Sequence, residues 1–378
     1  MPKHFGPGPG RVRLPPRQEG HDRMAERIVY FATNRIWDGK EGFGAVCCDP
    51  PGRLLAGKAA CVASADPAAE GSCVNVAVAT PDDPDTGLVD TLRGWLDQAR
   101  KEGRLPLLFV HGFNFGFAEA MARTASLCAW LEAGDGPDLA PFAFTWPSNG
   151  MGSLDAYRDD QKDAEQSGLA LARLIAALAT LHPKTAPVYL AHSMGARATR
   201  YGMEAIEPML ARLPKPVFRQ AVIMAGDDVA DVLDHPWRAV TPDSSAGGLR
   251  PIAELARHVT IGVNRDDGVV WLISGNVNRG DRLGTAGPAH PGDLPPNVRV
   301  VDYSYVVAGK ELKPVPPTEA EANWIGHQYF RNDPRTRVDL VKLLTTDGPP
   351  DQVQGRRGAV VDPATGVREV AGRLYVVP

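Results

Sequence analysis

One stretch, residues 187–196, restricts the fold of this chain more than any other. It begins as an apolar run typical of a buried strand, and residues 196–206 after it have the pattern of a helix. Ser193 lies at the tight turn between them, with the small residues Ala191 and Gly195 two positions to either side. This arrangement is typical of a nucleophile elbow, which holds a reactive serine above a sheet. The alternative is an ordinary turn after a buried strand, because short motifs recur by chance.

The segments around this stretch alternate between strand and helix. Such alternation with short links predicts an α/β fold, with a mainly parallel central sheet and helices on both faces. Functional residues in such sheets lie at the carboxyl ends of the strands. The expected strands are 27–33, 74–79, 105–110, 141–146, 220–225, 259–263 and 298–307, and the expected helices are 88–101, 117–131, 155–181, 251–257 and 335–344.

The ends of the chain differ in composition from its centre. Residues 1–26 are rich in glycine, proline and charge, which predicts a flexible tail. Residues 27–347 are expected to form one α/β-hydrolase catalytic domain, in which the irregular insertion 228–250 is a candidate lid. Residues 348–378 read as a polar C-terminal extension that ends in a strand-like segment. Residues 36–72 are rich in glycine, proline, alanine and aspartate, with short strand-like pieces near 45–48.

Composition excludes several classes of function. The formal net charge of -4 gives no reason to expect nucleic acid as a partner. No run approaches the roughly 20 apolar residues of a membrane span, so no stable membrane insertion is expected. The five cysteines include the adjacent Cys47 and Cys48 and suit free thiols in a reducing compartment, which predicts a cytoplasmic protein. No metal-ligand spacing occurs, and we expect neither a metal nor another cofactor.

A serine nucleophile needs a base and an acid, which follow it in the order acid and then histidine in this fold. His327 follows the last expected strand and precedes the last helix, where the general base is placed. Asp267 follows the strand 259–263 and is the first choice of acid. The alternatives are its neighbour Asp266, which one residue of register would exchange with it, and the pair Asp227 and Asp228 after the preceding strand. For that pair, a helix cap or a structural contact is the preferred interpretation.

The second expected part is an oxyanion hole. One donor is the backbone N–H of Met194, directly after the serine, and the other comes from the loop that follows an earlier strand. The glycine-containing segment 111–116 supplies that loop, with the N–H of Phe113 as the expected donor. A plain strand-to-helix turn would look similar in isolation. Its place two βα units before the elbow favours the catalytic interpretation.

Polar and aromatic residues near the expected strand ends are candidates for a substrate pocket. Aromatic side chains are often buried only for their area, so core packing is the alternative for each of them. The residues expected to line the pocket are Asn114, Phe115, Trp146, Trp237 and Trp324.

These parts predict a serine hydrolase that cleaves carboxylic esters of small molecules through an acyl-enzyme. His327 would remove the proton of Ser193, and Asp267 would orient the imidazole. The same machinery also serves amidases, peptidases and acyltransferases. A non-catalytic binding module on the same scaffold is a further alternative, against which the intact set of three residues argues.

Several of these segments together resemble a bacterial esterase/lipase-like family of α/β-hydrolases that is catalogued as domain of unknown function 900. The resemblance extends over residues 27–345 and implies Ser193 as nucleophile, Asp267 as acid and His327 as base. The chain departs from the pattern at Gly226, where proline is expected, and at the doubled Asp266-Asp267. The segments that carry it are Phe31–Arg35, Val110–Asn114, Thr145–Ser148, Tyr157 and Asp160 with Ala164 and Ser167, Ala191–Gly195, Arg282–Gly284 and Gly326–Phe330.

Overall fold

The structure is a computed structural model of the 378-residue chain. It describes residues 24–37, 42–48, 50–66, 69, 71–80, 82–239, 241, 244–278, 280–304, 326–346, 357–358 and 374–376. Within these residues no helix has both the length and the apolar character needed to cross a bilayer.

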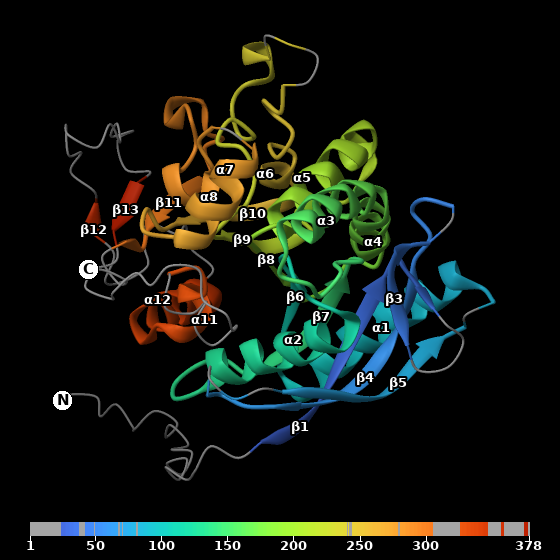
Figure 1. The fold of residues 1–378 in the computed structure, drawn as a ribbon. Coiled ribbons are helices and arrows are strands. Elements are labelled where there is room, and N and C mark those ends of the chain that lie inside the picture. Colours follow the sequence, from blue (N-terminus) through green and yellow to red (C-terminus); the bar gives the residue numbers. More distant parts are fainter. Residues whose placement is uncertain are drawn as a thin grey trace, which may run out of the picture.

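The centre of the molecule is a twisted sheet that is mainly parallel, as predicted (Figure 1). In the described part of the chain its strand order is β12-β13-β11-β10-β9-β8-β6-β7-β1-β4-β5. The strands from β13 to β1 run parallel, whereas β4, β5 and β12 pair antiparallel at the two edges. The strands are β1 (Ala25–Thr33), β2 (Arg35–Trp37), β3 (Phe43–Cys47), β4 (Leu55–Ala63), β5 (Ser72–Ala79), β6 (Leu105–Val110), β7 (Leu139–Thr145), β8 (Val188–His192), β9 (Phe218–Met224), β10 (Ala256–Val263), β11 (Val298–Asp302), β12 (Arg357–Gly358) and β13 (Leu374–Val376), with β2 and β3 forming a separate two-stranded sheet.

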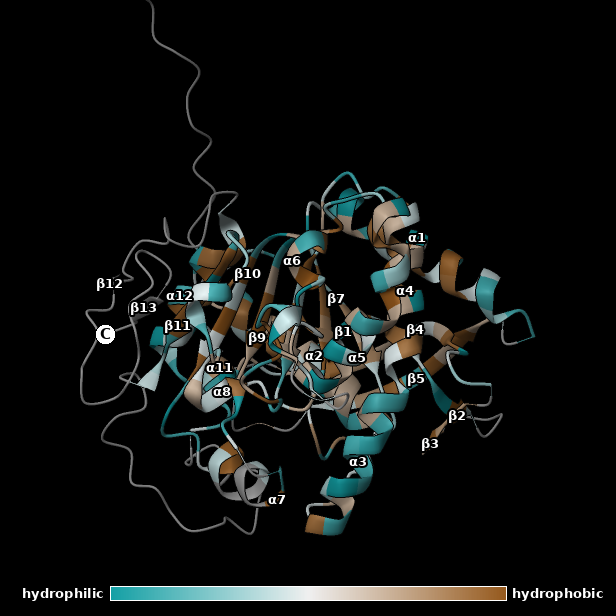
Figure 2. Cartoon of the chain, turned by 90° about the horizontal axis from the view of Figure 1, so that it is seen from above, coloured by the Kyte–Doolittle hydropathy of each residue, from teal (hydrophilic) through white to brown (hydrophobic). Residues whose placement is uncertain are grey.

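Helices cover both faces of the sheet and bury its apolar strands. Helices α1, α4 and α5 pack on one face, and α2, α11 and α12 pack on the other. The central strands are strongly hydrophobic, whereas the outer helix α3 is largely polar (Figure 2). The helices are α1 (Pro84–Glu102), α2 (Phe117–Glu132), α3 (Leu154–Gln166), α4 (Gly168–Thr180), α5 (Gly195–Ile206), α6 (Ile252–Leu255), α7 (Gly275–Asn278), α8 (Leu283–Ala286), α11 (Tyr329–Asn332) and α12 (Pro334–Thr345), with short 3₁₀ turns η1 (Glu207–Arg212), η2 (Pro236–Arg238) and η4 (Pro291–Asp293) and a π-helical turn η3 (Val270–Ser274).

Strand β4 lies within residues 36–72, where the sequence indicated only short strand-like pieces near 45–48. β4 is a nine-residue strand hydrogen-bonded to β1 on one side and β5 on the other. Four of its nine residues are alanine, which is a poor strand former by propensity. Burial explains the strand: Ala56 faces the same core as α1, whereas Ala59 and Cys61 face α2. Tertiary packing on both faces thus overrides the local preference.

The single helix predicted over residues 155–181 is divided into α3 and α4 at Ser167. The Ser167 hydroxyl donates to the Asp163 carbonyl at 2.6 Å and accepts the Asn34 side-chain amide at 2.9 Å. A Cβ on the next residue, Gly168, would lie 2.6 Å from backbone and side-chain atoms of Tyr201 in α5. The break therefore serves the close approach of α4 to α5, a contact that helical periodicity does not contain.

The described residues include the start of the predicted domain and part of the predicted C-terminal extension. β1 begins at Ala25, two residues before the predicted start of the domain, and residues 1–23 of the predicted tail lie outside the described residues. In the predicted extension, the strand-like segment near residue 374 is strand β13, which pairs parallel with β11. The C-terminal segment thus adds a strand to the same sheet.

The candidate lid is anchored to the body of the protein at both ends. Val232, Leu233 and Leu249 are fully buried in the core, and the Leu249 N–H donates to the Val232 carbonyl at 2.9 Å. Arg250 donates to the carbonyl of Leu233 at 2.8 Å. These contacts fix the two ends of the excursion, and its role as a lid stays a prediction.

Candidate active site

Ser193 lies at the turn from β8 into α5, at the carboxyl edge of the parallel strands. Its φ of 54° is in the left-handed region, which is costly for a residue with a side chain and concentrates at functional sites. Two backbone hydrogen bonds maintain this conformation: the Ser193 N–H donates to the Met224 carbonyl at 3.0 Å, and its carbonyl accepts the Asp227 N–H at 2.9 Å. The end of strand β9 therefore holds the serine in its strained position.

Small residues make this turn possible. A Cβ on Gly195 would lie 2.6 Å from the Val110 carbonyl oxygen, and one on Gly112 would lie 2.8 Å from the Cβ of Ser193. Both distances are shorter than side chains tolerate. The loop after β6 therefore approaches the serine directly, and its role as an oxyanion loop stays a prediction.

His327 and Asp267 form a buried pair. The imidazole Nδ1 of His327 lies 2.7 Å from Oδ2 of Asp267, and the two residues are 6% and 0% exposed. Oδ1 of Asp267 accepts the N–H groups of Val269 and Val270 at 3.1 and 3.0 Å. Because the carboxylate accepts from the imidazole, the Nδ1 atom carries the proton and Nε2 is left as the acceptor.

The loop that carries His327 is tied to the strand that carries Asp267. The side chain of Asn264, at the end of β10, donates to the Gly326 carbonyl at 2.8 Å. His192, next to the serine, lies 3.3 Å from the His327 carbonyl through Nε2, and the two rings are 4.7 Å apart. Burial, together with the nearby His327, lowers the pKa of His192 well below its ordinary value. His192 is therefore an uncharged side chain that packs beside the pair of His327 and Asp267.

The other candidate acids have different surroundings. Asp266 is exposed, and His327 bonds its neighbour instead. Asp227 is buried and accepts from Arg282 at 2.8 Å and from the Tyr157 hydroxyl at 2.6 Å. Its burial would raise its pKa, but these donors, together with the Ser274 hydroxyl, lower it on balance. Asp228 is fully buried and accepts from Arg200 at 2.8 Å. Both carboxylates are thus structural partners of arginines, in line with the structural interpretation of this pair.

Three backbone N–H groups of loop 111–116 donate to side chains of the described residues. The N–H of Asn114 is directed at Asp160 at 3.5 Å, that of Phe115 at the Ser148 hydroxyl at 3.1 Å and that of Gly116 at Glu119 at 2.7 Å. The Phe113 N–H has no hydrogen-bond partner in the described part of the chain, and neither has the Met194 N–H. The sequence predicted these two N–H groups as oxyanion donors, and that role stays a prediction.

His111 and Trp146 support this loop from beneath. The Trp146 indole N–H donates to the His111 carbonyl at 2.8 Å, and the two rings stack at 5.0 Å with an interplanar angle of 10°. Burial and the charge of Arg35 lower the pKa of His111 to about 3, so its ring is neutral. Trp146 is fully enclosed, so the prediction that it lines a substrate pocket was wrong. Its large area fills the core under the loop instead.

The remaining predicted pocket residues are not gathered in one place. Asn114 is exposed with a φ of 67°, and Phe115 is buried with its ring edge against His111. Trp237 is 66% exposed on η2, where it contacts His235 and Arg238. The role of Trp237 in a substrate pocket stays a prediction. Trp324 lies outside the described residues.

Tyr157 is a residue near the site that sequence reasoning did not select. Its ring meets that of Phe113 edge to face at 5.4 Å, and its hydroxyl bonds Asp227. Asn278 of α7 donates to the same hydroxyl at 3.0 Å, and Gln161 donates to Asn278 at 2.7 Å. The signal that could have found it was its place in the Tyr157-x-x-Asp160 segment.

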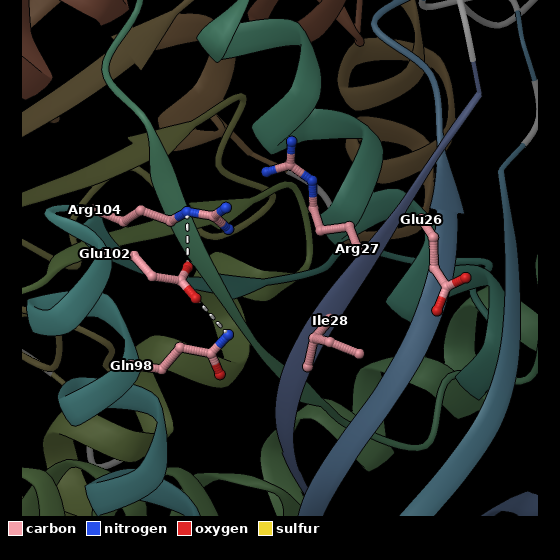
Figure 3. A pocket seen from close by; sticks show the side chains of 6 residues that line it. All are labelled: Glu26, Arg27, Ile28, Gln98, Glu102 and Arg104. Atoms are coloured by element: carbon pink, nitrogen blue, oxygen red, sulfur yellow. Dashed lines mark hydrogen bonds and ion pairs between the residues drawn. The ribbon is translucent and has the colours of Figure 1, made fainter.

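Two hollows on the surface lie away from Ser193. One, of about 230 Å³, is at the start of β1 and is lined by side chains of β1, the end of α1 and Arg104 (Figure 3). This is the edge opposite to the carboxyl ends of the strands, where substrates bind in such sheets. The other, of about 330 Å³, lies between the excursion after β9 and the segment before α8, and Asp231, Ser244 and Asp281 are among its lining residues.

The side chains near Ser193 offer acid–base chemistry rather than metal ligands. Within the described residues, no group of three or more histidine, cysteine or acidic side chains is arranged to hold a metal ion. The arrangement supplies a strained serine, an oriented imidazole and two unpaired backbone donors, which are the parts that acyl transfer requires.

Comparison with known proteins agrees with this architecture. No curated protein matches the sequence closely enough to count as a relative. A sequence model of one protein family, described as an alpha/beta hydrolase of unknown function (DUF900), matches residues 90–343. The match begins within α1, so strands β1 to β5 lie outside it, including the Phe31–Arg35 segment on which the resemblance partly rested. Because this match covers more than half of the chain and the fold agrees with it, the chain belongs to the alpha/beta hydrolase family DUF900.

Proposed function

We propose that this hydrolase cleaves carboxylic esters of small molecules with the triad Ser193, His327 and Asp267. The observation that carries the proposal is the presence, at one edge of the sheet, of a serine with a strained backbone and a buried histidine–aspartate pair. Backbone strain at Ser193 needs a reason, and a turn that presents the hydroxyl of a nucleophile provides one.

The proposed reaction begins with the serine. The hydroxyl oxygen of Ser193 attacks the ester carbonyl carbon while Nε2 of His327 takes its proton. Asp267 keeps the other imidazole proton on Nδ1 and stabilises the cation that forms. The oxygen that becomes negative accepts the free N–H groups of Phe113 and Met194.

The second half of the reaction releases the products. The imidazolium gives its proton to the leaving alcohol, and an acyl-serine remains. Water then attacks this ester with His327 again as base, which releases the acid and restores the serine. An amide would need the same steps with a poorer leaving group, so esters are the class that this machinery cleaves most readily.

The five cysteines bear on the location of the protein. All of them are free thiols. Free thiols persist in a reducing compartment, which supports our proposal of a cytoplasmic enzyme.

The test is labelling of the purified protein with a fluorophosphonate probe, together with hydrolysis of p-nitrophenyl esters of increasing chain length. We expect the wild type to be labelled and active, and Ser193→Ala to lose the label and at least about 10⁴-fold in kcat/KM. Gly112→Ala keeps the nucleophile but places a methyl group 2.8 Å from the Ser193 Cβ, and it should also abolish labelling.

Ser72→Ala is the matched control, since Ser72 is an exposed serine on the edge strand β5. It should label and hydrolyse esters like the wild type. A folded wild type that neither labels nor hydrolyses any ester would overturn the proposal. Equal ester hydrolysis by the wild type and Ser193→Ala would do the same.

A further inference from the structure

Four segments that are far apart in the sequence come together at the loop 111–116. They are Arg35 at the start of β2, Ser148 after β7, Asp160 in α3 and the loop itself. Three of them are anchored by side chains that take no part in the proposed chemistry. Arg35 and Asp160 are 1% and 0% exposed, so two opposite charges are buried here.

Asp160 connects α3 to the two loops that follow β6 and β7. Its carboxylate accepts the Ser148 hydroxyl, the backbone N–H of Asn149 at 2.9 Å and the side-chain amide of Asn149 at 2.7 Å. A longer contact of 3.5 Å reaches the Asn114 N–H. The Ser148 hydroxyl in turn accepts the Phe115 N–H at 3.1 Å. A single carboxylate thus fixes both loops.

Arg35 holds the same two loops from the other side. Its guanidinium donates to the Phe115 carbonyl at 2.8 Å and to the Ser148 carbonyl at 3.1 Å. It also donates to the Thr145 hydroxyl at 3.1 Å and the Gly44 carbonyl at 3.2 Å. The rigid fork of arginine suits such multiple carbonyl contacts, and lysine cannot reproduce them.

The consequence for the loop is selective. These contacts, with Glu119, occupy the N–H groups of Asn114, Phe115 and Gly116 and leave that of Phe113 unpaired. A preorganised donor contributes to catalysis only when its position is fixed before the negative charge develops. Proteins hold such donors through a supporting layer of hydrogen bonds.

We propose that Asp160 and Arg35 are positioning residues that fix loop 111–116 so that the Phe113 N–H points at the developing oxyanion. The inference rests on the proposed function and deepens it. It predicts that a variant which breaks these hydrogen bonds stabilises the transition state less, while it binds the ground-state substrate as the wild type does.

Asp160→Asn is the first test, because it removes the charge with little change of shape. We expect kcat for the best p-nitrophenyl ester to fall by about 10- to 100-fold with KM within roughly threefold, since a donor displaced by a fraction of an ångström is only partly lost. The affinity for a trifluoromethyl ketone, whose adduct carries an oxyanion, should fall by the same factor as kcat/KM. Asp159→Asn is the matched control: Asp159 is its exposed neighbour, paired with Lys162 at 3.0 Å, and kcat should be unchanged.

Ser148→Ala is the second variant and keeps the test decisive if Asp160→Asn does not fold. It removes the hydroxyl that links Asp160 to the Phe115 N–H, and we expect the same selective loss of kcat. Because both variants break one shared hydrogen bond, the double variant should lose less than the product of the two single losses.

Three results would overturn the inference. They are an unchanged kcat in folded variants, a rise of KM that accounts for the whole loss, and a trifluoromethyl ketone affinity that stays at the wild-type value while kcat falls. Failure of the proposed function itself is distinguishable, because then the wild type would not be labelled by a fluorophosphonate, whereas the inference predicts slower labelling of Asp160→Asn at the same serine.

Discussion

The protein contains two histidine–aspartate pairs with the same geometry but different surroundings. In one, Nδ1 of His327 lies 2.7 Å from Asp267, and the histidine side chain is 7% exposed. In the other, Nδ1 of His290 lies 2.5 Å from Asp234, and the histidine side chain is 48% exposed. Both aspartates are buried. The pairing alone therefore does not mark an active site.

The difference lies in what stands next to each pair. Asp267 follows β10 at the same sheet edge as Ser193, which is the serine with a positive φ among the described residues. His290 precedes the 3₁₀ turn η4, and its backbone N–H also donates to Asp234 at 3.1 Å. The second pair links the excursion after β9 to the segment that precedes η4. The comparison teaches that the proposed site differs from the second pair by a serine with a strained backbone at the same strand edge.

The largest expected effect separates the two pairs by activity. His327→Ala and Asp267→Asn should each lower kcat/KM for the best ester by roughly 10⁴-fold, because the base is lost or held in the wrong tautomer. His290→Ala should leave kcat/KM within about twofold. Steady-state kinetics on the three variants measure this, with circular dichroism as the check of folding. Comparable losses in His290→Ala and His327→Ala would erase the distinction.

The second prediction compares two buried aspartates that follow neighbouring strands. Asp227 accepts from Arg282, whose Nε and Nη1 atoms are buried with no partner among the described residues. Asp227→Asn leaves this arginine charge uncompensated and should lower the free energy of unfolding by about 3–5 kcal/mol. Asp267→Asn should cost less stability and far more activity. Urea denaturation at pH 7 measures both variants.

The pH dependence of the Asp227 effect has a definite sign. Its pKa in the folded protein lies below the ordinary value, so its stabilising contribution is present above the unfolded value of about 3.9 and is lost as the pH falls through the folded one. The difference in unfolding free energy between wild type and Asp227→Asn should therefore be constant near neutral pH and narrow below about pH 4. A gap that is constant from pH 7 to pH 3 would contradict this account.

Much of this arrangement could be predicted from the sequence, because it depends on local patterns. The strand-to-helix turn at Ser193, the glycines of loop 111–116 and the strand before Asp267 are short-range features. The pairing of His327 with Asp267 rather than Asp266 is also the one that the sequence preferred, although their role in catalysis stays a prediction. These positions follow from strand ends, which hydrophobic runs mark well.

The remaining features depend on contacts between distant segments. Strand β4 was missed because its alanines become a strand only between two helices, and the break at Ser167 exists because α4 approaches α5 closely. In the sequence, Trp146 has the position of a residue that lines a pocket. Only its stacking on His111 identifies it as a support of loop 111–116. Propensity and periodicity contain no information about such partners.

The smallest predicted effect concerns a carboxylate that has neither an arginine nor a histidine partner. Asp163, in α3, is half-buried near Asp160 and Asp159, and burial together with these charges raises its pKa to about 6. A raised folded pKa means that the folded state is favoured below the unfolded value of about 3.9 and loses that advantage as the pH rises to about 6. Asp163→Asn removes the ionisable carboxyl group and therefore also this loss of stability at high pH. After discounting for partial exposure to solvent, it should stabilise the protein by about 1 kcal/mol above pH 7 and by nothing measurable at pH 4.

Thermal unfolding of wild type and Asp163→Asn across this pH range provides the measurement. Asp159→Asn is again the control, since its carboxylate is exposed and paired with Lys162. A stabilisation that is equal at pH 4 and pH 8 would mean that helix propensity or shape, rather than charge, causes the effect. A stabilisation confined to high pH would instead show that a carboxylate in this fold is costly wherever burial comes without a matched donor. Asp267 has a histidine as its matched donor and Asp227 has an arginine, whereas Asp163 has neither.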